Sequence, residues 1–252
     1  MIPAFLLLSS AALALAQPPE FVTIPAGSFI MGCESALPCS KTLPKKLVTI
    51  ERPFQLSKYE VTVGQFRAFV KATGYVTDAE KAGDARTWRS PGFTLSKRQP
   101  VVFMTLNDAA AYCSFIGARV PFEAEWEYAA RAGSATHHYW GEEIDGRYLW
   151  YFDNTDERPM PVGRKLPNAW GLFDMEGNAM EWVRDAGPHS SITRAGAGSL
   201  RGGSYAMCPE PYPPSQGIRQ RFIWLGPTFP GSENSNFRRD ERRFDFGIRC
   251  AR

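Results

Sequence analysis

Glycine and proline recur so often along the chain that long uninterrupted helices and strands are not expected. The 252 residues include 22 Gly and 20 Pro. Glycine supplies the backbone angles that tight turns require, and proline interrupts helices and central strands. Aromatic residues make up 13% of the chain and would fill an irregular core. The sequence therefore predicts a loop-rich fold in which regular secondary structure is sparse.

The chain is long enough to bury a sizeable core, and its charges are nearly balanced. With 44% hydrophobic and 22% charged residues, its length suits one large globular domain or two small ones. The sequence contains no internal repeat, low-complexity tract or linker, so we predict that residues 17–252 form one domain. A net charge of +3 is too small to indicate a nucleic acid or an anionic membrane as partner.

The first 16 residues are typical of a secretory signal peptide. Their apolar run ends in Ala14-Leu15-Ala16, which suits signal peptidase, and prolines follow at positions 18 and 19. The run is short for a membrane span. The alternatives to a cleaved signal peptide are an uncleaved anchor and a buried first helix. We predict cleavage before Gln17, no membrane span afterwards, and a secreted or periplasmic protein in a compartment where disulfides persist.

Strands are predicted where apolar residues alternate. Residues 21–32 alternate and then turn, as a short hairpin would, and 46–50 and 54–61 follow as two further strands. A last strand is expected over 244–250.

Three helices are predicted in the middle of the chain. The first follows Thr62, a suitable N-cap, because apolar residues recur there at helical spacing. The second follows Asn107 and ends near Gly117. The third begins near Pro121, and its acidic start suits the helix dipole. Between the first two helices, residues 74–98 are predicted to form a long irregular loop.

The five cysteines are an odd number, which leaves at least one thiol free or bonded to another chain. Their spacing suggests a local bridge between Cys33 and Cys39, with two unpaired loop thiols as the alternative. The histidines at positions 137, 138 and 189 are predicted to be surface residues, because adjacent histidines cannot easily face one metal.

Several ordered blocks of the sequence resemble the formylglycine-generating-enzyme family, also called the sulfatase-modifying-factor family. They are Ile24-Pro-Ala-Gly-Ser-Phe-Ile-Met-Gly32, Tyr59-Glu-Val-Thr62, Pro100-Val-Val102, Arg119-Val-Pro-Phe-Glu-Ala-Glu-Trp-Glu-Tyr128, Pro167-Asn-Ala-Trp-Gly-Leu-Phe-Asp-Met-Glu-Gly-Asn-Ala-Met-Glu-Trp182, Arg201-Gly-Gly-Ser-Tyr205 and Phe246-Gly-Ile-Arg-Cys250. Each block alone is a weak signal, but their number and order make the resemblance specific. It implies an α+β fold, a loop-rich variant of the C-type lectin fold with few short helices and strands.

The resemblance also implies a disulfide and a metal. Cys113 and Cys250 match a pair that is disulfide-bonded in characterised members. The segment 174–181 resembles the family's calcium loop. In this match Asp174 and Glu181 give side-chain ligands, and Gly177 and Ala179 give carbonyl oxygens, which are the ligands that Ca²⁺ prefers. The alternative is a plain turn whose acidic side chains cap neighbouring amides.

The copper-dependent oxidases of this family carry two cysteines, five residues apart, after a Gly-Gly-Ser-Tyr turn, and soft thiolates suit copper(I). Here the turn is followed by a single cysteine, Cys208, one position later than in the family, and Pro213 stands five residues after it. The family's two-thiolate site therefore cannot be built by that arrangement, and copper at Cys208 stays an open question. Ser204 matches a residue that donates a hydrogen bond near the site, with simple turn chemistry as the alternative.

Two functions of different classes follow from the resemblance. A metal-dependent oxidase would use Cys208 and Ser204 to oxidise a protein cysteine, or a related thiol or phenol, with O₂. A non-catalytic module of the lectin-like fold would bind a peptide or small molecule through the segment 209–235 and nearby aromatic side chains. The aromatic residues predicted to line that groove are Tyr205, Tyr212, Phe222 and Trp224.

Overall fold

The computed structural model describes residues 18–32, 45–184, 198–209, 223–224 and 237–252. The following predictions lie outside these ranges: the signal peptide, the Cys33–Cys39 bridge, His189, Tyr212 and Phe222. Among the described helices, none is long and apolar enough to cross a membrane.

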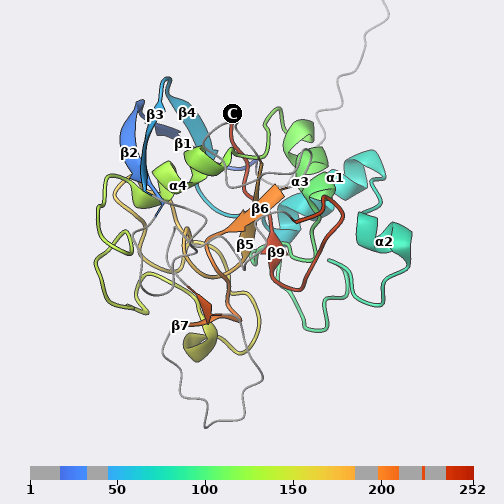
Figure 1. Ribbon diagram of the computed structural model, residues 1–252. Helices are drawn as coiled ribbons and strands as arrows, with labels where there is room; N and C mark the ends of the chain where they lie inside the picture. The colour runs from blue at the N-terminus through green and yellow to red at the C-terminus, as the bar shows by residue number, and fades with distance from the viewer. Residues whose placement is uncertain (1–17, 33–44, 185–197, 210–222, 225–236) are drawn as a thin grey trace, which may run out of the picture.

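Two antiparallel strand pairs lie together at one end of the molecule (Figure 1). Strand β1 (Phe21–Ile24) pairs with β4 (Phe54–Ser57), and β2 (Gly27–Met31) pairs with β3 (Lys46–Ile50). The predicted hairpin over 21–32 is therefore wrong, because β1 and β2 have different partners. A two-residue hairpin turn needs positive φ at its first central residue, and the residue after β1 is Pro25, whose ring fixes φ near −65°.

A three-stranded sheet lies at the centre of the fold and supports the site described below. Strand β5 (Met180–Arg184) runs between β6 (Gly198–Arg201), which is antiparallel to it, and β9 (Phe246–Gly247), which is parallel. The last strand is thus shorter than the predicted span 244–250. Two further short strands, β7 (Cys208–Pro209) and β8 (Ile223–Trp224), pair in parallel.

Helices α1 (Val63–Thr73) and α2 (Asp78–Ala82) both begin with reciprocal capping bonds. The Thr62 hydroxyl accepts from the Gln65 amide at 3.3 Å, and the Gln65 side chain accepts from the Thr62 amide at 2.9 Å, so the predicted N-cap is confirmed. Helix α2 lies inside the predicted loop 74–98. Its five residues are too few for a helical hydrophobic pattern, and Thr77 and Glu80 form its capping box.

Helices α3 (Leu106–Phe115) and α4 (Glu123–Arg131) both contact β5. Thr105 caps α3, and Gly117 beyond its end has φ +69°. Helix α4 starts after Phe122, whose amide donates to the Glu125 carboxylate at 2.9 Å. A single 3₁₀ turn, η1, covers Phe152–Asn154. These short helices and strands give the α+β architecture that we predicted.

Aromatic side chains from distant segments fill the largest core cluster. Phe66 of α1 packs edge-on against Trp88 with ring centroids 5.1 Å apart, and Trp182 of β5 packs against Phe246 of β9 at 5.6 Å. The Trp182 indole donates to the Met104 carbonyl at 2.8 Å. Both faces of β5 are buried, so residues attached to this strand are held rigidly.

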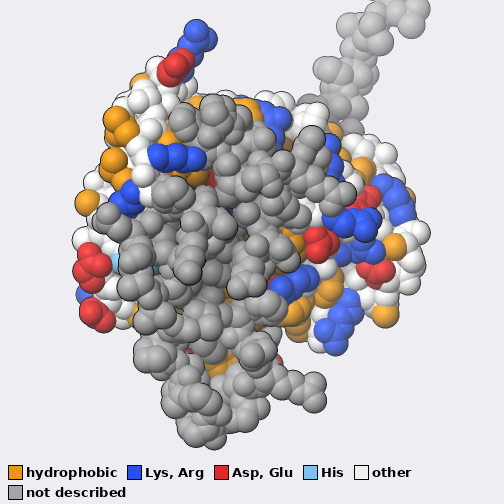
Figure 2. Space-filling model, in the orientation of Figure 1, with side chains coloured by type: hydrophobic (Ala, Val, Ile, Leu, Met, Phe, Trp, Pro, Cys, Tyr) orange, Lys and Arg blue, Asp and Glu red, His pale blue; other side chains and the backbone are white. Residues whose placement is uncertain are grey.

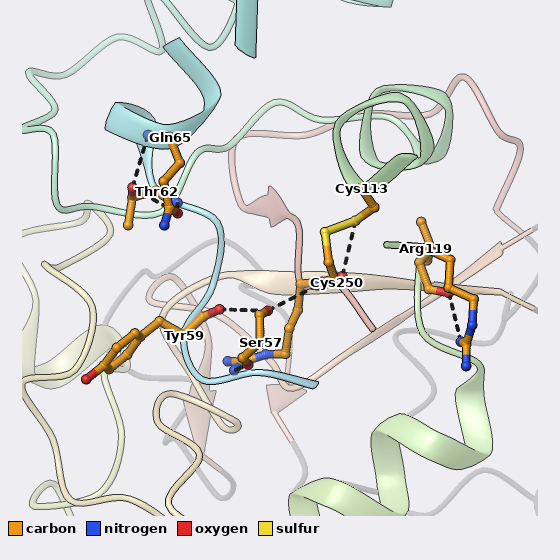
Figure 3. Close-up of a disulfide and its surroundings, with 9 residues drawn as sticks. Ser57, Tyr59, Thr62, Gln65, Cys113, Arg119 and Cys250 are labelled. Carbon is orange, nitrogen blue, oxygen red and sulfur yellow. Dashed lines mark hydrogen bonds between the residues drawn. A yellow bond between two sulfur atoms is a disulfide. The ribbon is translucent and has the colours of Figure 1, made fainter. Parts of the chain in front are cut away.

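A disulfide joins α3 to the last residues of the chain (Figure 3). It links Cys113 and Cys250, the pair implied by the resemblance, with Cα atoms 5.6 Å apart. Beside it, the amide of Ser57 donates to the Cys250 carbonyl at 2.8 Å, and the amide of Cys250 donates to the Ser57 hydroxyl at 3.1 Å. The bridge therefore ties α3 to the segment that follows β9 and, through it, to β4.

Positive and negative side chains are interspersed over the side of the molecule that carries α1 and α2 (Figures 1 and 2). Ion pairs on this side include Arg89 with Glu80 at 2.7 Å and Arg242 with Asp84 at 2.6 Å. Such exposed pairs contribute little to stability, but they leave no large field of one sign on this side of the described surface.

Candidate functional site

The turn that leads from β6 to β7 contains the residues for which chemistry was predicted. Gly202 and Gly203 begin it, with φ of +92° and +71°. A Cβ atom at Gly202 would lie 3.0 Å from the carbonyl oxygen of Met175 and 3.1 Å from the Trp126 ring. Only glycine allows this close approach, which places the turn directly against the predicted calcium loop and α4.

Ser204 is paired with a buried carboxylate that the sequence did not reveal. Its hydroxyl donates to Asp245 Oδ2 at 2.9 Å, and both side chains are buried. Burial raises the pKa of the Asp245 carboxyl, and the opposing effects of the Arg243 charge and the Ser204 hydrogen bond are smaller. Asp245 Oδ1 has no hydrogen bond and lies 3.7 Å from Arg243 Nε. The pair can take up or release a proton beside the turn.

Tyr205 is packed in the interior, which differs from the predicted place on a ligand groove. Its ring is 1% exposed and lies between Phe93 and Phe244, with centroids 6.2 and 6.1 Å away. Its hydroxyl donates to the Phe244 carbonyl at 3.2 Å. Tyr205 therefore fixes the turn against the segment that carries Asp245.

The backbone places Cys208 at the end of this turn. Cys208 is opposite Ile223 in the β7–β8 pair, and Pro209 is opposite Trp224, so two residues of the predicted site share one small sheet. The amide of Phe152, the first residue of η1, donates to the Met207 carbonyl at 3.0 Å, so η1 also holds the turn in place.

The described residues do not fit the family's copper site. Cys113 and Cys250 are bonded to each other, and the sequence has no cysteine five residues after Cys208. Within the described ranges, no group of three or more His, Cys, Asp or Glu side chains is arranged to hold a metal. We therefore derive no step through copper.

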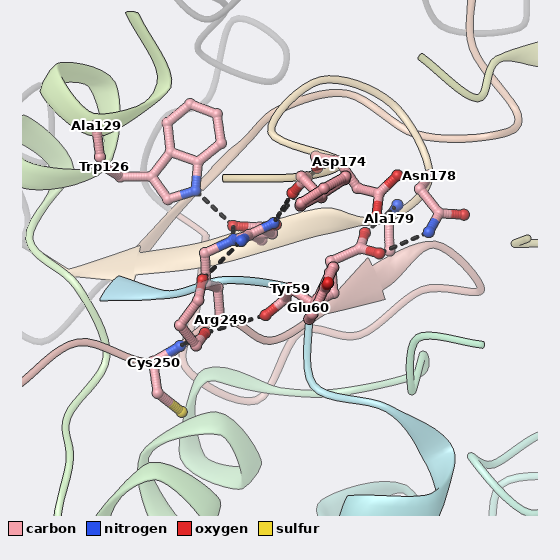
Figure 4. A network of polar contacts seen from close by, with 12 residues as sticks. Tyr59, Glu60, Trp126, Ala129, Asp174, Asn178, Ala179, Arg249 and Cys250 are labelled. Carbon is pink, nitrogen blue, oxygen red and sulfur yellow. Dashed lines mark hydrogen bonds and ion pairs between the residues drawn. The ribbon is translucent and has the colours of Figure 1, made fainter. Parts of the chain in front are cut away.

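The predicted calcium loop forms hydrogen bonds with the turn and belongs to a network of buried charges (Figure 4). Asp174 has φ +53° and is buried, and its Oδ2 accepts from the Gly163 amide at 2.7 Å. Its Oδ1 has no hydrogen-bond partner. Both oxygens of Glu181 accept from Arg249 Nε at 2.8 Å, and one also accepts from the Trp126 indole at 2.5 Å.

The charges of this network do not balance. Three buried carboxylates, Glu60, Asp174 and Glu181, surround one buried guanidinium, Arg249. Burial and the neighbouring carboxylates raise the pKa of Glu60 well above its usual value, and burial raises that of Asp174 to about 6. A divalent cation at the free oxygen of Asp174 would compensate the excess negative charge, but both oxygens of Glu181 are bound by Arg249, so of the two predicted side-chain ligands only Asp174 has an oxygen available.

His138 is buried, so the prediction that it is a surface residue is wrong. Its Nδ1 lies 2.7 Å from Glu176 Oε2, and its ring stacks on Trp140 with centroids 4.5 Å apart. The buried carboxylate of Glu176 compensates for the loss of solvent around the imidazole. This partner lies 38 residues away, so the local sequence gave no sign of it.

Sequence reasoning missed Glu60, Asp245 and Arg249 as members of the site. Glu60 stands within a block that carried the resemblance, but nothing local to it indicated a role. Asp245 and Arg249 offered a usable signal, because charged residues inside a mostly apolar predicted strand demand buried partners.

Comparison with known proteins agrees with this architecture. The family model described as "Sulfatase-modifying factor enzyme 1-like domain" matches residues 9–252. The formylglycine-generating enzyme of Streptomyces coelicolor is 34% identical over 292 aligned positions, which cover 91% of this chain and 88% of that enzyme. The mouse protein named inactive C-alpha-formylglycine-generating enzyme 2 is 32% identical, with 67% of this chain and 69% of that protein covered.

Among solved structures, PvdO from Pseudomonas aeruginosa superposes with a TM-score of 0.70 at 29% identity, over 93% of this chain and 94% of that one. The chain belongs to the formylglycine-generating-enzyme (sulfatase-modifying-factor) family, and its fold is the family's loop-rich α+β variant of the C-type lectin fold. The family contains enzymes and a relative named inactive, so membership alone does not decide whether this chain is catalytic.

Proposed function

We propose that this chain is an exported oxidoreductase that oxidises a thiol or phenol with O₂ at the turn formed by residues 202–208. The observation that supports this most is the buried Ser204–Asp245 pair, whose serine belongs to the turn that ends at Cys208. A buried carboxylate with a raised pKa is common where an enzyme moves protons, and this one adjoins the turn that holds Cys208.

The proposed reaction removes two electrons and two protons from the substrate. Two thiols lose their S–H protons and form one S–S bond, or a dihydric phenol loses its two O–H protons and becomes a quinone. Dioxygen takes up both electrons and both protons and leaves as hydrogen peroxide. Ionised Asp245 accepts one substrate proton through the Ser204 hydroxyl and then releases it to the reduced dioxygen, and Cys208 contacts the substrate.

We also propose that calcium binds at Asp174 and Glu181, with the carbonyl oxygens of Gly177 and Ala179. Its role is structural, because it would neutralise the excess negative charge of the buried network and stiffen the loop that forms hydrogen bonds with the turn.

The alternative function is a binding module without catalysis. The observation in its favour is the incomplete cysteine pair, since the family's copper-binding arrangement needs a second thiolate that this chain lacks. In that case ligands would bind near β7 and β8 and remain unchanged.

Oxygen uptake by the mature protein tests the proposal. The probes are a cysteine-containing peptide, 2-mercaptoethanol and hydroquinone, each with and without added copper or calcium. We expect uptake with at least one probe, a loss of about tenfold or more in Ser204→Ala and Asp245→Asn, and near-complete loss in Cys208→Ala. Asp145→Asn is the matched control, because Asp145 forms an ion pair with exposed Arg147. Binding of the probes without uptake would favour the binding module.

A further inference from the structure

One short segment, residues 177–180, holds the turn on both sides of Ser204. The amide of Gly177 donates to the Gly202 carbonyl at 2.6 Å, and the amide of Tyr205 donates to the Asn178 carbonyl at 2.8 Å. Ser204 lies between these two attachments. Its position therefore follows the position of Gly177 and Asn178.

The same segment also holds the acidic partner of Ser204. The amide of Met180 donates to the carbonyl of Asp245 at 2.9 Å, next to the parallel pairing of Met180 with Phe246. Both members of the Ser204–Asp245 hydrogen bond are thus attached to one stretch of four residues. A small displacement of this stretch changes the geometry of that bond.

The side chain of Asn178 anchors the stretch to two other parts of the molecule (Figure 4). Its Nδ2 donates to Glu60 Oε2 at 2.6 Å and to the Met160 carbonyl at 3.2 Å, and its Oδ1 accepts from the Met160 amide at 2.8 Å. The other oxygen of Glu60 accepts from the Ala179 amide at 2.8 Å. Asn178 is fully buried and has φ +59°. The hydrogen bonds of its side chain hold the side-chain amide in one orientation.

We propose that Asn178 is a positioning residue, which together with Glu60 holds the Ser204–Asp245 pair in its reactive geometry. This inference rests on the proposed function for its catalytic consequence. The chain of contacts itself runs from Glu60 through Asn178 to the turn and does not depend on the substrate.

The proposal is tested by exchanging the hydrogen-bond donor at position 178 with the acceptor at position 60. Asn178→Asp places a carboxylate against Glu60, and Glu60→Gln sets an amide donor against either Asn178 Nδ2 or the Ala179 amide. In the double variant Glu60→Gln/Asn178→Asp, the new amide at position 60 accepts from the Ala179 amide and donates to the new carboxylate at position 178. The double variant therefore has the net charge of the natural protein and restores the contact between positions 60 and 178 with its direction reversed, while the Met160 carbonyl loses its donor.

Asn168→Asp is the matched control. Asn168 is also a buried asparagine with several backbone bonds, donating to the Ala129 and Ala130 carbonyls and accepting from the Leu172 amide. It contacts the end of α4 and not the turn. Its substitution should lower stability without moving Ser204.

Two measurements are made on all variants with calcium present at saturation. For the peptide that covers residues 199–208, amide hydrogen exchange should accelerate about tenfold in each single variant, stay near the natural rate in Asn168→Asp, and return part of the way to the natural rate in the double variant. With the probe that gives the fastest oxygen uptake, kcat should fall about tenfold in each single variant while KM changes by no more than about twofold. The double variant should regain part of the lost kcat.

Equal exchange in Asn178→Asp and Asn168→Asp, or no recovery in the double variant, overturns the inference. If the natural protein consumes no oxygen with any probe, the proposed function fails while hydrogen exchange still decides the structural claim. If Asn178→Asp does not fold, Glu60→Gln and the double variant provide the same comparison.

Discussion

Removal of the Cys113–Cys250 bridge should lower stability by an amount that the sequence separation predicts. The two cysteines are 137 residues apart. In the chain-entropy model, opening a loop of this length frees unfolded-state entropy equivalent to about 5 kcal/mol at 25 °C. Both residues are fully buried, so the lost sulfur atoms add about 1–2 kcal/mol of cavity cost. For a chain of this size the sum corresponds to a fall in Tm of roughly 12–28 °C.

The assay is urea unfolding and thermal melting of Cys113→Ala/Cys250→Ala beside the natural protein. Cys208→Ala is the control, because it removes one cysteine and leaves the bridge in place. The single variant Cys113→Ala should lose nearly as much as the double one, since either substitution opens the loop. A double variant within about 1 kcal/mol of the natural protein would show that the bridge does not restrict the unfolded chain as described.

Three further predictions concern the turn and the network of buried charges. Chelation of calcium should lower Tm by about 5–10 °C relative to protein with calcium at a hundredfold excess over its Kd, and Asp174→Ala should abolish this difference. Gly202→Ala should cost about 2–4 kcal/mol in urea unfolding, whereas Gly117→Ala, with a similar positive φ of +69° but open space around it, should cost only about 1 kcal/mol. Because burial raises the pKa of Asp245, kcat/KM should fall as pH drops through a value above the ordinary 4, and Asp245→Asn should lose this acid limb. The raised pKa also means that Asp245 stabilises the folded state at pH values below its ordinary pKa, and that this stabilisation is lost as pH rises through the raised pKa. Asp245→Asn should therefore melt at a higher temperature than the natural protein at neutral pH.

Local signals in the sequence predicted the local features of the fold. Thr62 stands before a run with helical spacing and caps α1 as expected, and the high content of glycine and proline corresponds to short strands and helices. Helix α2 was missed because five residues cannot show a periodic pattern. The hairpin over 21–32 was wrong because alternation reveals strands but not their partners.

The chemistry of the site depends on contacts between residues far apart in the sequence. Asn178 bonds Glu60 across 118 residues, and Ser204 bonds Asp245 across 41. No periodicity or spacing encodes such pairs, so the sequence alone indicated the turn at 202–208 but not the acid behind it. The resemblance to the family supplied Cys113 with Cys250, and the structure joins the same two residues.

The most direct test of the central claim is product analysis by mass spectrometry with isotopically labelled dioxygen, using the probe that supports oxygen uptake. We predict an unlabelled disulfide or quinone, one labelled hydrogen peroxide for each disulfide or quinone formed, and at least about tenfold less of both products in Asp245→Asn. Labelled oxygen in the organic product, or full activity in Asp245→Asn, would contradict the proposed removal of two electrons and two protons at the Ser204–Asp245 pair.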